Sequence, residues 1–133
     1  MITVNIKTDK NGLFEITHDV KAAIHNSGIQ SGIAVLWVPH STAGVTVVSR
    51  MDELGLLDIE DEINRLVPTR VDFKHQYDTP SDAAGHIKSA IIGVSISLIV
   101  DGGELVCSPG SGIFFFEFDG PRKRRYHIKI IGS

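Results

Sequence analysis

Cysteine is nearly absent from this sequence, which contains Cys107 alone among its 133 residues. A single thiol excludes an internal disulfide framework and a zinc ribbon, since both need several cysteines. Long hydrophobic runs are absent as well, because the stretch AIIGVSISLIV ends after residues 90–100 and contains two serines. A membrane-spanning helix needs about 20 apolar residues, so no membrane partner is expected.

A large excess of charge of one sign is also absent from the sequence. The chain carries 13 Lys and Arg against 16 Asp and Glu, a formal net charge of −3. Such a balance gives no electrostatic reason to expect nucleic acid or an anionic membrane as a partner. The N-terminus, MITVNIKT, lacks the basic segment and apolar core of a secretory leader. The cytoplasm is therefore the expected location.

The composition that remains is that of an ordinary globular protein. Apolar residues make up 42% of the chain and charged residues 22%, which argues against disorder. The length fits one domain that can bury a core without disulfides. We therefore expect a single domain over residues 1–133.

Hydrophobic periodicity and turn chemistry predict the secondary structure. Thr17, Asp52 and Asp82 are expected to cap the first turns of three helices. Gly28 and Gly93 supply the expected ends of two of these helices. The expected strands cover residues 2–7, 13–16, 33–38, 45–49, 94–100, 104–107, 112–118 and 124–131, and the expected helices cover 17–27, 52–67 and 82–92. The fold class is α+β, with a mixed or mostly antiparallel sheet and about three helices covering one face.

Three of the six histidines have ordinary structural explanations. His18 and His25 fall at the ends of the first helix, where an exposed imidazole is common. His127 alternates with apolar neighbours on the last strand, so it is expected to point away from the core.

The segment VPHSTAGVTVV presents a fourth histidine in unusual company. His40 follows Pro39 directly after a strand, and two hydroxyl residues, Ser41 and Thr42, follow it. Ala43 and the next glycine add almost no bulk. This pattern predicts a loop at which a ligand could approach His40 and the two hydroxyls.

The remaining histidines lie beside the irregular stretch 69–81, and long loops in compact domains tend to carry function. His75 is in this loop, and His86 follows on the third helix. Asp82 and His86 are four residues apart, so they share one helix face. The small residues between them, AAG, are expected to leave open space.

Any one of these histidines could simply be satisfied by a backbone hydrogen bond. Three together favour a shared site, although no HxxxH pair supports zinc locally. His40, His75 and His86 could be the protein ligands of an open metal position. Alternatively, they could act as acid, base and phosphate donor without a metal.

The aromatic strand GIFFFEFDGPR, residues 112–122, adds two polar candidates. Glu117 lies on a strand with two apolar faces, so its carboxylate needs a partner. It could hold the second nitrogen of a histidine, or pair with Arg122. Arg122 could instead form a bidentate contact with phosphate. The basic run 122–125 is expected to be a solvated turn.

These motifs resemble the YjbQ family from about Gly12 onward. PHSTAGVTV, DAAGHIKSAIIG, DGGEL and IFFFEFDGPRKR occur in this order and at these intervals in that family. The resemblance implies a YjbQ-type α+β fold, a homotrimer, and a pocket of histidines that holds an anion or a metal. The matching positions are His40, Thr42, His75, His86, Glu117 and Arg122.

The chain also departs from the family pattern in two places. Val48 and Ser49 stand where relatives typically have an Asn–Glu pair. The segment SPGSG, residues 108–112, stands where relatives have Gly-x-Trp-Gln. These departures favour a binding role more than in a typical relative.

The resemblance implies a small cytoplasmic enzyme that acts on phosphorylated small molecules. YjbQ proteins are often described as having secondary thiamine-phosphate synthase activity, in which a thiazole phosphate joins a pyrimidine diphosphate and pyrophosphate leaves. The alternatives are a metal-dependent hydrolase and a non-catalytic trimeric module that binds an anion or metabolite. The expected catalytic residues are His40, His86 and Glu117, the substrate-binding residues are Ser41, Thr42, Asp82 and Arg122, and the ligands of a possible Zn²⁺ or Mg²⁺ ion are His40, His75 and His86.

Overall fold

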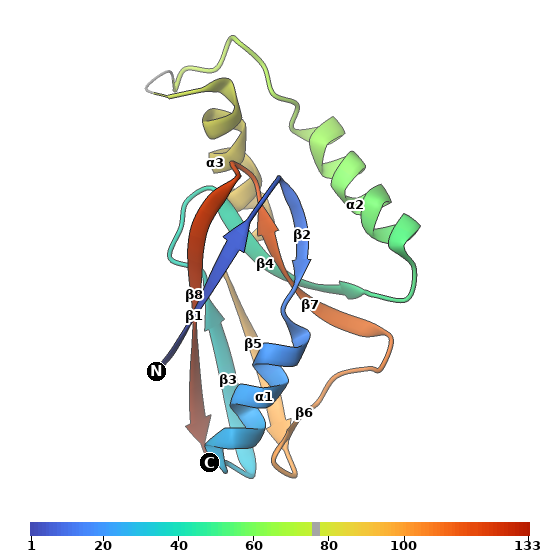
Figure 1. The fold of residues 1–133 in the computed structure, drawn as a ribbon, viewed down its shortest axis with the longest axis vertical. Helices are drawn as coiled ribbons and strands as arrows, with labels where there is room; N and C mark the ends of the chain where they lie inside the picture. The colour runs from blue at the N-terminus through green and yellow to red at the C-terminus, as the bar shows by residue number, and fades with distance from the viewer. Residues whose placement is uncertain (76–77) are drawn as a thin grey trace.

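The described residues fold into two antiparallel sheets and three helices (Figure 1). The computed structural model describes residues 1–75 and 78–133. Within these ranges the elements are β1 (Ile2–Thr8), β2 (Gly12–Glu15), α1 (Thr17–Ser27), β3 (Ser31–Trp37), β4 (Ala43–Ser49), α2 (Glu53–Leu66), α3 (Pro80–Ile92), β5 (Ser95–Asp101), β6 (Glu104–Leu105), β7 (Ser111–Glu117) and β8 (Arg122–Gly132). None of the described helices is long and apolar enough to cross a bilayer.

The larger sheet has the strand order β1-β8-β3-β5-β6, and the smaller one has the order β2-β7-β4. Neighbouring strands in the described part of the chain are all antiparallel. The predicted α+β class with a mostly antiparallel arrangement is therefore confirmed. The expectation of one sheet was wrong, because β7 pairs with β2 and β4 while its neighbour in sequence, β8, pairs with β1 and β3.

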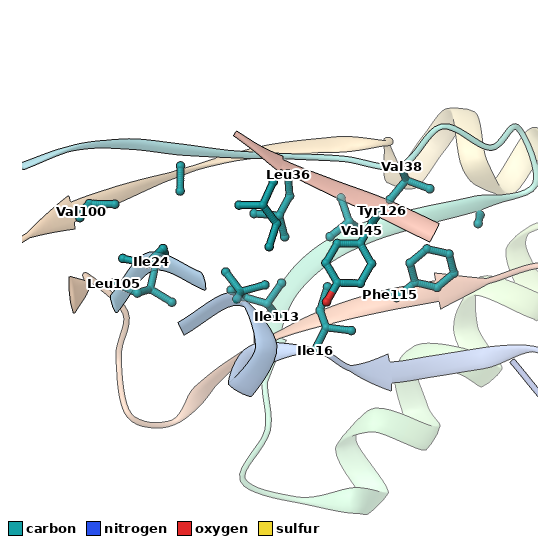
Figure 2. Packing of buried hydrophobic residues seen from close by; sticks show 14 residues of the cluster. Ile16, Ile24, Leu36, Val38, Val45, Val100, Leu105, Ile113, Phe115 and Tyr126 are labelled. Carbon is teal, nitrogen blue, oxygen red and sulfur yellow. The ribbon is translucent and has the colours of Figure 1, made fainter. Parts of the chain in front are cut away.

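The main core lies between the two sheets, with α1 closing one end (Figure 2). Val20 and Ile24 occupy one face of α1, since residues four apart lie above one another on a helix. They pack with inward side chains from both sheets. The largest contributors from the sheets are Leu36, Val38, Val45, Val100, Ile113, Phe115, Tyr126 and Ile128.

Strand β7 is buried on both of its faces, which explains its continuous apolar sequence. Phe115 points into the main core. On the opposite face, Phe116 lines a cavity of about 30 Å³ together with Asn64 of α2 and Lys88 of α3. The helices therefore cover the small sheet from both sides, α1 on one and α2 and α3 on the other, instead of the single side that was expected.

The first two helices begin and end close to the predicted residues. Asp52 caps α2, since its carboxylate accepts a 3.0 Å hydrogen bond from the backbone N–H of Leu54. Gly28 ends α1 with a φ of 72°, a conformation that favours glycine. The prediction that Thr17 caps α1 was wrong. Its hydroxyl instead accepts a bond from the backbone N–H of Ile113 and so ties the helix to β7.

Candidate functional site

The start of α3 directs the carboxylate of Asp82 toward the candidate histidines. Asp82 was expected to cap this helix, but the helix begins earlier and Thr79 is the cap. The Thr79 hydroxyl accepts a 3.1 Å bond from the backbone N–H of Asp82. Pro80 occupies the first helical position, where a missing N–H costs nothing. Because Thr79 does the capping, the Asp82 side chain is left to interact elsewhere.

Asp82 contacts two histidines at once. Its Oδ2 atom lies 2.8 Å from Nε2 of His75 and 3.3 Å from Nε2 of His86. The two imidazole rings are nearly perpendicular, at 88°, with centroids 5.0 Å apart. One ligand atom from each of the three residues lies within 4.8 Å of the other two. The three side chains can therefore converge on one ion.

Exposure differs across this cluster. The Asp82 side chain is 13% exposed, whereas those of His75 and His86 are 38% and 40% exposed. The hydrogen bond with His75 lowers the pKa of Asp82; burial opposes this shift, and the nearby His86 and Asp119 add to it. Asp82 thus presents an anionic oxygen to two imidazoles that solvent or a ligand can reach.

A small second core holds the His75 loop against α3. Val67 and Phe73 pack on Ala83 and Ala84. The guanidinium of Arg70 stacks over the Phe73 ring at 4.6 Å, in the range of a cation–π contact. These contacts bring His75 of the loop beside His86 of α3.

The small residues AAG of α3 were expected to leave open space, and this was wrong at Gly85, where the packing is close, whereas Ala83 lines a hollow. A Cβ atom at Gly85 would lie 3.2 Å from both the Thr42 Cβ atom and the Phe118 carbonyl oxygen. The Ser89 hydroxyl donates a 2.7 Å bond to the Ala43 carbonyl. Glycine thus lets α3 lie against the start of β4, which fixes the position of His86 relative to the sheet.

Arg122 is connected to this cluster by Asp119, which contacts both Arg122 and Asp82. Its Nη2 atom is 2.8 Å from Oδ2 of Asp119, and its Nε–H donates to the Asp119 carbonyl. The hydrogen bond with Asp119 raises the pKa of Arg122. The expectation that Arg122 pairs with Glu117 was wrong, because the turn places Asp119 within its reach.

Glu117 instead pairs with Arg124 inside the molecule. The Arg124 guanidinium donates to both carboxylate oxygens, at 2.8 and 2.6 Å. The Thr8 hydroxyl and the N–H groups of Phe118 and Asp119 also donate to this carboxylate. Glu117 is 0% exposed, so it does not reach a histidine or the surface.

The pKa of Glu117 reflects two opposing effects. Burial alone would raise this pKa, but the hydrogen bonds from Arg124, Asp119 and Thr8 outweigh burial and lower it. The Arg124 guanidinium also donates a 2.8 Å bond to the hydroxyl of Thr42. Thr42 is nearly buried, so the expected substrate contact is replaced by a contact that holds Arg124.

Arg124 is the residue that the sequence analysis missed. It lies within the basic run that was expected to be a solvated turn, yet it is 8% exposed. On β8 it is followed at intervals of two residues by Tyr126 and Ile128, which are also buried. This period of two was the available signal, because it places Arg124 on the inner face of the strand.

His40 lies near His86 but outside the three-residue cluster. Its Nε2 atom accepts a 3.1 Å bond from the backbone N–H of Arg125. Burial lowers the pKa of His40, and the positive charges of Arg124 and Arg125 act in the same direction. The imidazole is therefore neutral near pH 7, and because Nε2 accepts, its proton is on Nδ1.

Two hollows meet at His86. The first, about 540 Å³, is lined by Arg70, Asp72, Phe73, Lys74, His75, Ala83, His86 and Ile87. The second, about 740 Å³, is lined by residues that include Trp37, His40, Ser41 and His86. Of the three predicted metal ligands, the structure brings His75 and His86 together with Asp82 and places His40 along the second hollow.

The other histidines lie apart from this cluster. His25 contacts Glu104 and His127 contacts the Thr3 hydroxyl, each at 2.9 Å. His18 lines a separate hollow with Lys21 and other polar residues.

The donor set of the cluster discriminates between the two expected ions. Two imidazoles and one carboxylate form the set used by many open zinc sites. Mg²⁺ prefers an all-oxygen set with several waters. The residues present therefore fit Zn²⁺, or another ion that accepts nitrogen ligands, better than Mg²⁺.

Comparison with known proteins gives one consistent result. A family model described as "UPF0047 protein YjbQ-like" matches residues 2–133. The chain is 42% identical to UPF0047 protein MJ1081 of Methanocaldococcus jannaschii over 129 residues, which covers 96% of this chain and 91% of that protein. It is 36% identical to UPF0047 protein YugU of Bacillus subtilis, covering 98% of each chain.

Solved structures agree with these sequence matches. A YjbQ/UPF0047 protein of Clostridium acetobutylicum superposes with a TM-score of 0.90 at 35% identity, covering 98% of this chain and 100% of that one. A YbjQ-like protein of Sulfolobus solfataricus superposes with a TM-score of 0.93 at 28% identity, covering 99% and 96%. The chain belongs to the YjbQ-like UPF0047 family.

Proposed function

We propose that this protein is a divalent-cation-dependent enzyme that acts on phosphorylated small molecules. The observation that carries the proposal is the convergence of His75, Asp82 and His86, whose ligand atoms lie within 4.8 Å of one another. The cluster opens onto two hollows large enough for small ligands. Arg122 lies close by through Asp119 and adds positive charge.

Each residue has a distinct part in this proposal. His75, Asp82 and His86 hold the ion, which when bound supplies a Lewis acid that polarises a phosphoryl oxygen. Arg122 binds the phosphate as a cation. His40 and Ser41 contact the substrate from the second hollow. Glu117 acts from inside, as a positioning residue that fixes Arg124 and, through it, the segment that carries His40.

Hydrolysis of a phosphate ester is the reaction that this arrangement supports best. Water attacks phosphorus, the bond from phosphorus to the alcohol oxygen breaks, and the alcohol leaves with a proton. Transfer of the thiamine-phosphate synthase type is a second candidate. The two hollows share His86, which favours it, since each hollow could hold one co-substrate.

Metal binding tests the proposal first. The purified protein is loaded with ZnCl₂, desalted, and analysed for zinc by mass spectrometry. We expect about one zinc per chain in the wild type and a clear loss in His86→Ala and Asp82→Asn. His25→Ala is the matched control, because His25 also contacts a carboxylate but lies outside the site. Equal zinc content in all four proteins would contradict the proposed centre.

Measurements of turnover test whether the protein is an enzyme. A panel of phosphate esters and thiamine precursors is assayed with and without zinc. Release of phosphate or pyrophosphate that His86→Ala abolishes supports an enzyme. Zinc binding and ligand-induced thermal stabilisation without turnover would instead indicate a non-catalytic binding module.

The proposed working form is a cytoplasmic homotrimer. Apolar side chains are exposed in one row across the larger sheet, where Ile33 of β3 pairs with Ile99 of β5 and Ile131 of β8. Such a patch is typical of a surface that another chain covers. Light scattering after size exclusion tests the assembly, and cell fractionation tests the location.

A further inference from the structure

The hollow that contains His75 is lined by apolar and charged residues, and most of its lining surface is apolar. Phe73, Ala83 and Ile87 supply apolar surface. The ring of Phe73 is held in place by the guanidinium of Arg70, 4.6 Å away. Arg70, Asp72 and Lys74 also line the hollow and carry charge, and Arg70 is paired with Asp72 at 3.3 Å. The interior therefore suits a ligand part that makes no hydrogen bonds.

Two imidazoles and a carboxylate meet at this hollow. His75 and His86 both line it, and both contact the Asp82 carboxylate. A phosphate held at the cluster would consequently extend its ester group along Phe73 and Ile87. A polyhydroxylated group there would lose its hydration without finding matching donors and acceptors.

The size of the hollow sets a further limit. Its volume of about 540 Å³ lies within the range of small-molecule sites, roughly 300–1,000 Å³. One aromatic or branched aliphatic group fits such a space and would displace water from the exposed side chain of Ile87. Since Arg70 is balanced by Asp72, the excess positive charge of the lining comes from Lys74, and it favours an anionic ligand.

We propose that the ester group of the substrate is apolar: the site takes the phosphate ester of an aromatic or branched aliphatic alcohol, with the apolar group in the hollow of Phe73, Ala83 and Ile87. This inference rests on the proposed function for the position of the phosphate. It goes beyond that function by selecting apolar phosphate esters over sugar phosphates and nucleotides.

Two phosphonates test this selection, because they are not hydrolysed. Methylphosphonate and benzylphosphonate carry the same phosphonate group and differ in the phenyl ring. Isothermal titration of the zinc-loaded protein should give a Kd for benzylphosphonate at least about tenfold lower, since burying a ring adds favourable transfer free energy.

Two matched variants locate the ring. Ile87→Asn removes apolar surface from the hollow and adds no charge. Ile91→Asn makes the same change one turn later on α3, at a residue that is exposed and outside the hollow. We expect Ile87→Asn to abolish the preference for benzylphosphonate and leave methylphosphonate binding and zinc content unchanged. Ile91→Asn should behave as the wild type. Circular dichroism confirms that each variant is folded.

The outcomes separate the two proposals. If zinc does not bind, the cation-dependent function fails; the titration is then repeated without zinc, and a ring preference that Ile87→Asn removes still supports the apolar hollow. If zinc binds but both phosphonates bind equally, or both variants behave alike, the inference of an apolar ester group is overturned.

Discussion

At the scale of single residues, Glu117 of β7 and Arg124 of β8 form an ion pair that links the two sheets. Both side chains are buried, and Arg124 bridges the carboxylate to Thr42 beside the His40 loop. Removing one member of a buried ion pair leaves the other charge without compensation. The pair therefore stabilises the fold and also helps to fix the loop of His40, which lines the second hollow.

Glu117→Gln should destabilise the protein by about 3 kcal/mol at pH 7, because the guanidinium would remain buried without its counter-ion. The pKa of Glu117 is lowered from 4.5, so its stabilisation is complete above about pH 4.5 and is lost as pH falls through the folded-state pKa. Urea unfolding between pH 3 and pH 7 should show a weaker acid dependence in the variant. The exposed pair of Glu62 and Arg65 provides the control, and Glu62→Gln should leave unfolding unchanged. An equal effect of both substitutions would refute the argument.

Tyr126 presents the opposite case, a buried polar atom without compensation. Among the described residues its hydroxyl finds no hydrogen-bond partner, and burial raises its pKa. Figure 2 shows the hydroxyl pointing toward Ile16. Tyr126→Phe removes this group without changing the ring. We expect the free energy of unfolding to stay the same or to rise by up to about 1 kcal/mol.

Thr8→Val is the matched comparison for Tyr126→Phe. The Thr8 hydroxyl is buried and bonded both to the Glu117 carboxylate and to the N–H of Arg122. Its loss should cost about 1–3 kcal/mol, since it leaves buried polar groups unpaired. A larger cost for Tyr126→Phe than for Thr8→Val would show that the tyrosine hydroxyl is satisfied in solution.

At the scale of elements, the contact between α3 and β4 sets the position of His86. Gly85→Ala should destabilise the protein by about 1–3 kcal/mol although alanine favours helices, because the new methyl group would press on Thr42 and the Phe118 carbonyl. Gly55→Ala in α2 is the control. Its Cβ atom would meet nothing closer than 4.0 Å, so it should stabilise by about 0.5–1 kcal/mol. Thermal unfolding measures both, and a gain from Gly85→Ala would contradict the close packing.

The elements were largely predictable from sequence, because caps, glycine stops and periodicity are local. The pairing of strands was not, since the hydrophobic pattern of β7 fits both a one-sheet and a two-sheet arrangement. The candidate site was likewise predictable only where its contacts are local in the sequence. The four-residue spacing of Asp82 and His86 was visible in the sequence, whereas the approach of His75 depends on how Phe73 packs against α3. His40 was separated from them because the backbone of β8 binds its imidazole.

At the scale of the whole molecule, stability is distributed unevenly. Helix α2 has no buried residue, and Leu54, Leu57 and Leu66 are exposed on it. It stands at one side of the molecule (Figure 1), and residues 50–52 connect it to β4. One polar contact attaches it to the body: the Glu60 carboxylate accepts a 2.8 Å hydrogen bond from the backbone N–H of Leu13. A helix with so little burial should open more readily than the central strands.

The tie between Asn64 and Lys88 gives this expectation a direct test. Lys88 is 5% exposed, burial lowers its pKa, and its ammonium group donates a 2.7 Å bond to Asn64. Asn64→Ala removes this acceptor, so α2 should lose part of its attachment to α3. Hydrogen exchange measured by mass spectrometry should show α2 exchanging faster than β3 in the wild type, and faster still in the variant, with β3 unchanged. Asn26→Ala, at an exposed position of α1, is the control and should not alter α2. If α2 is as well protected from exchange as β3, another chain covers the exposed leucines of α2, as the proposed trimer allows. If Asn64→Ala leaves the exchange rate of α2 unchanged, the bond from Lys88 does not hold the helix.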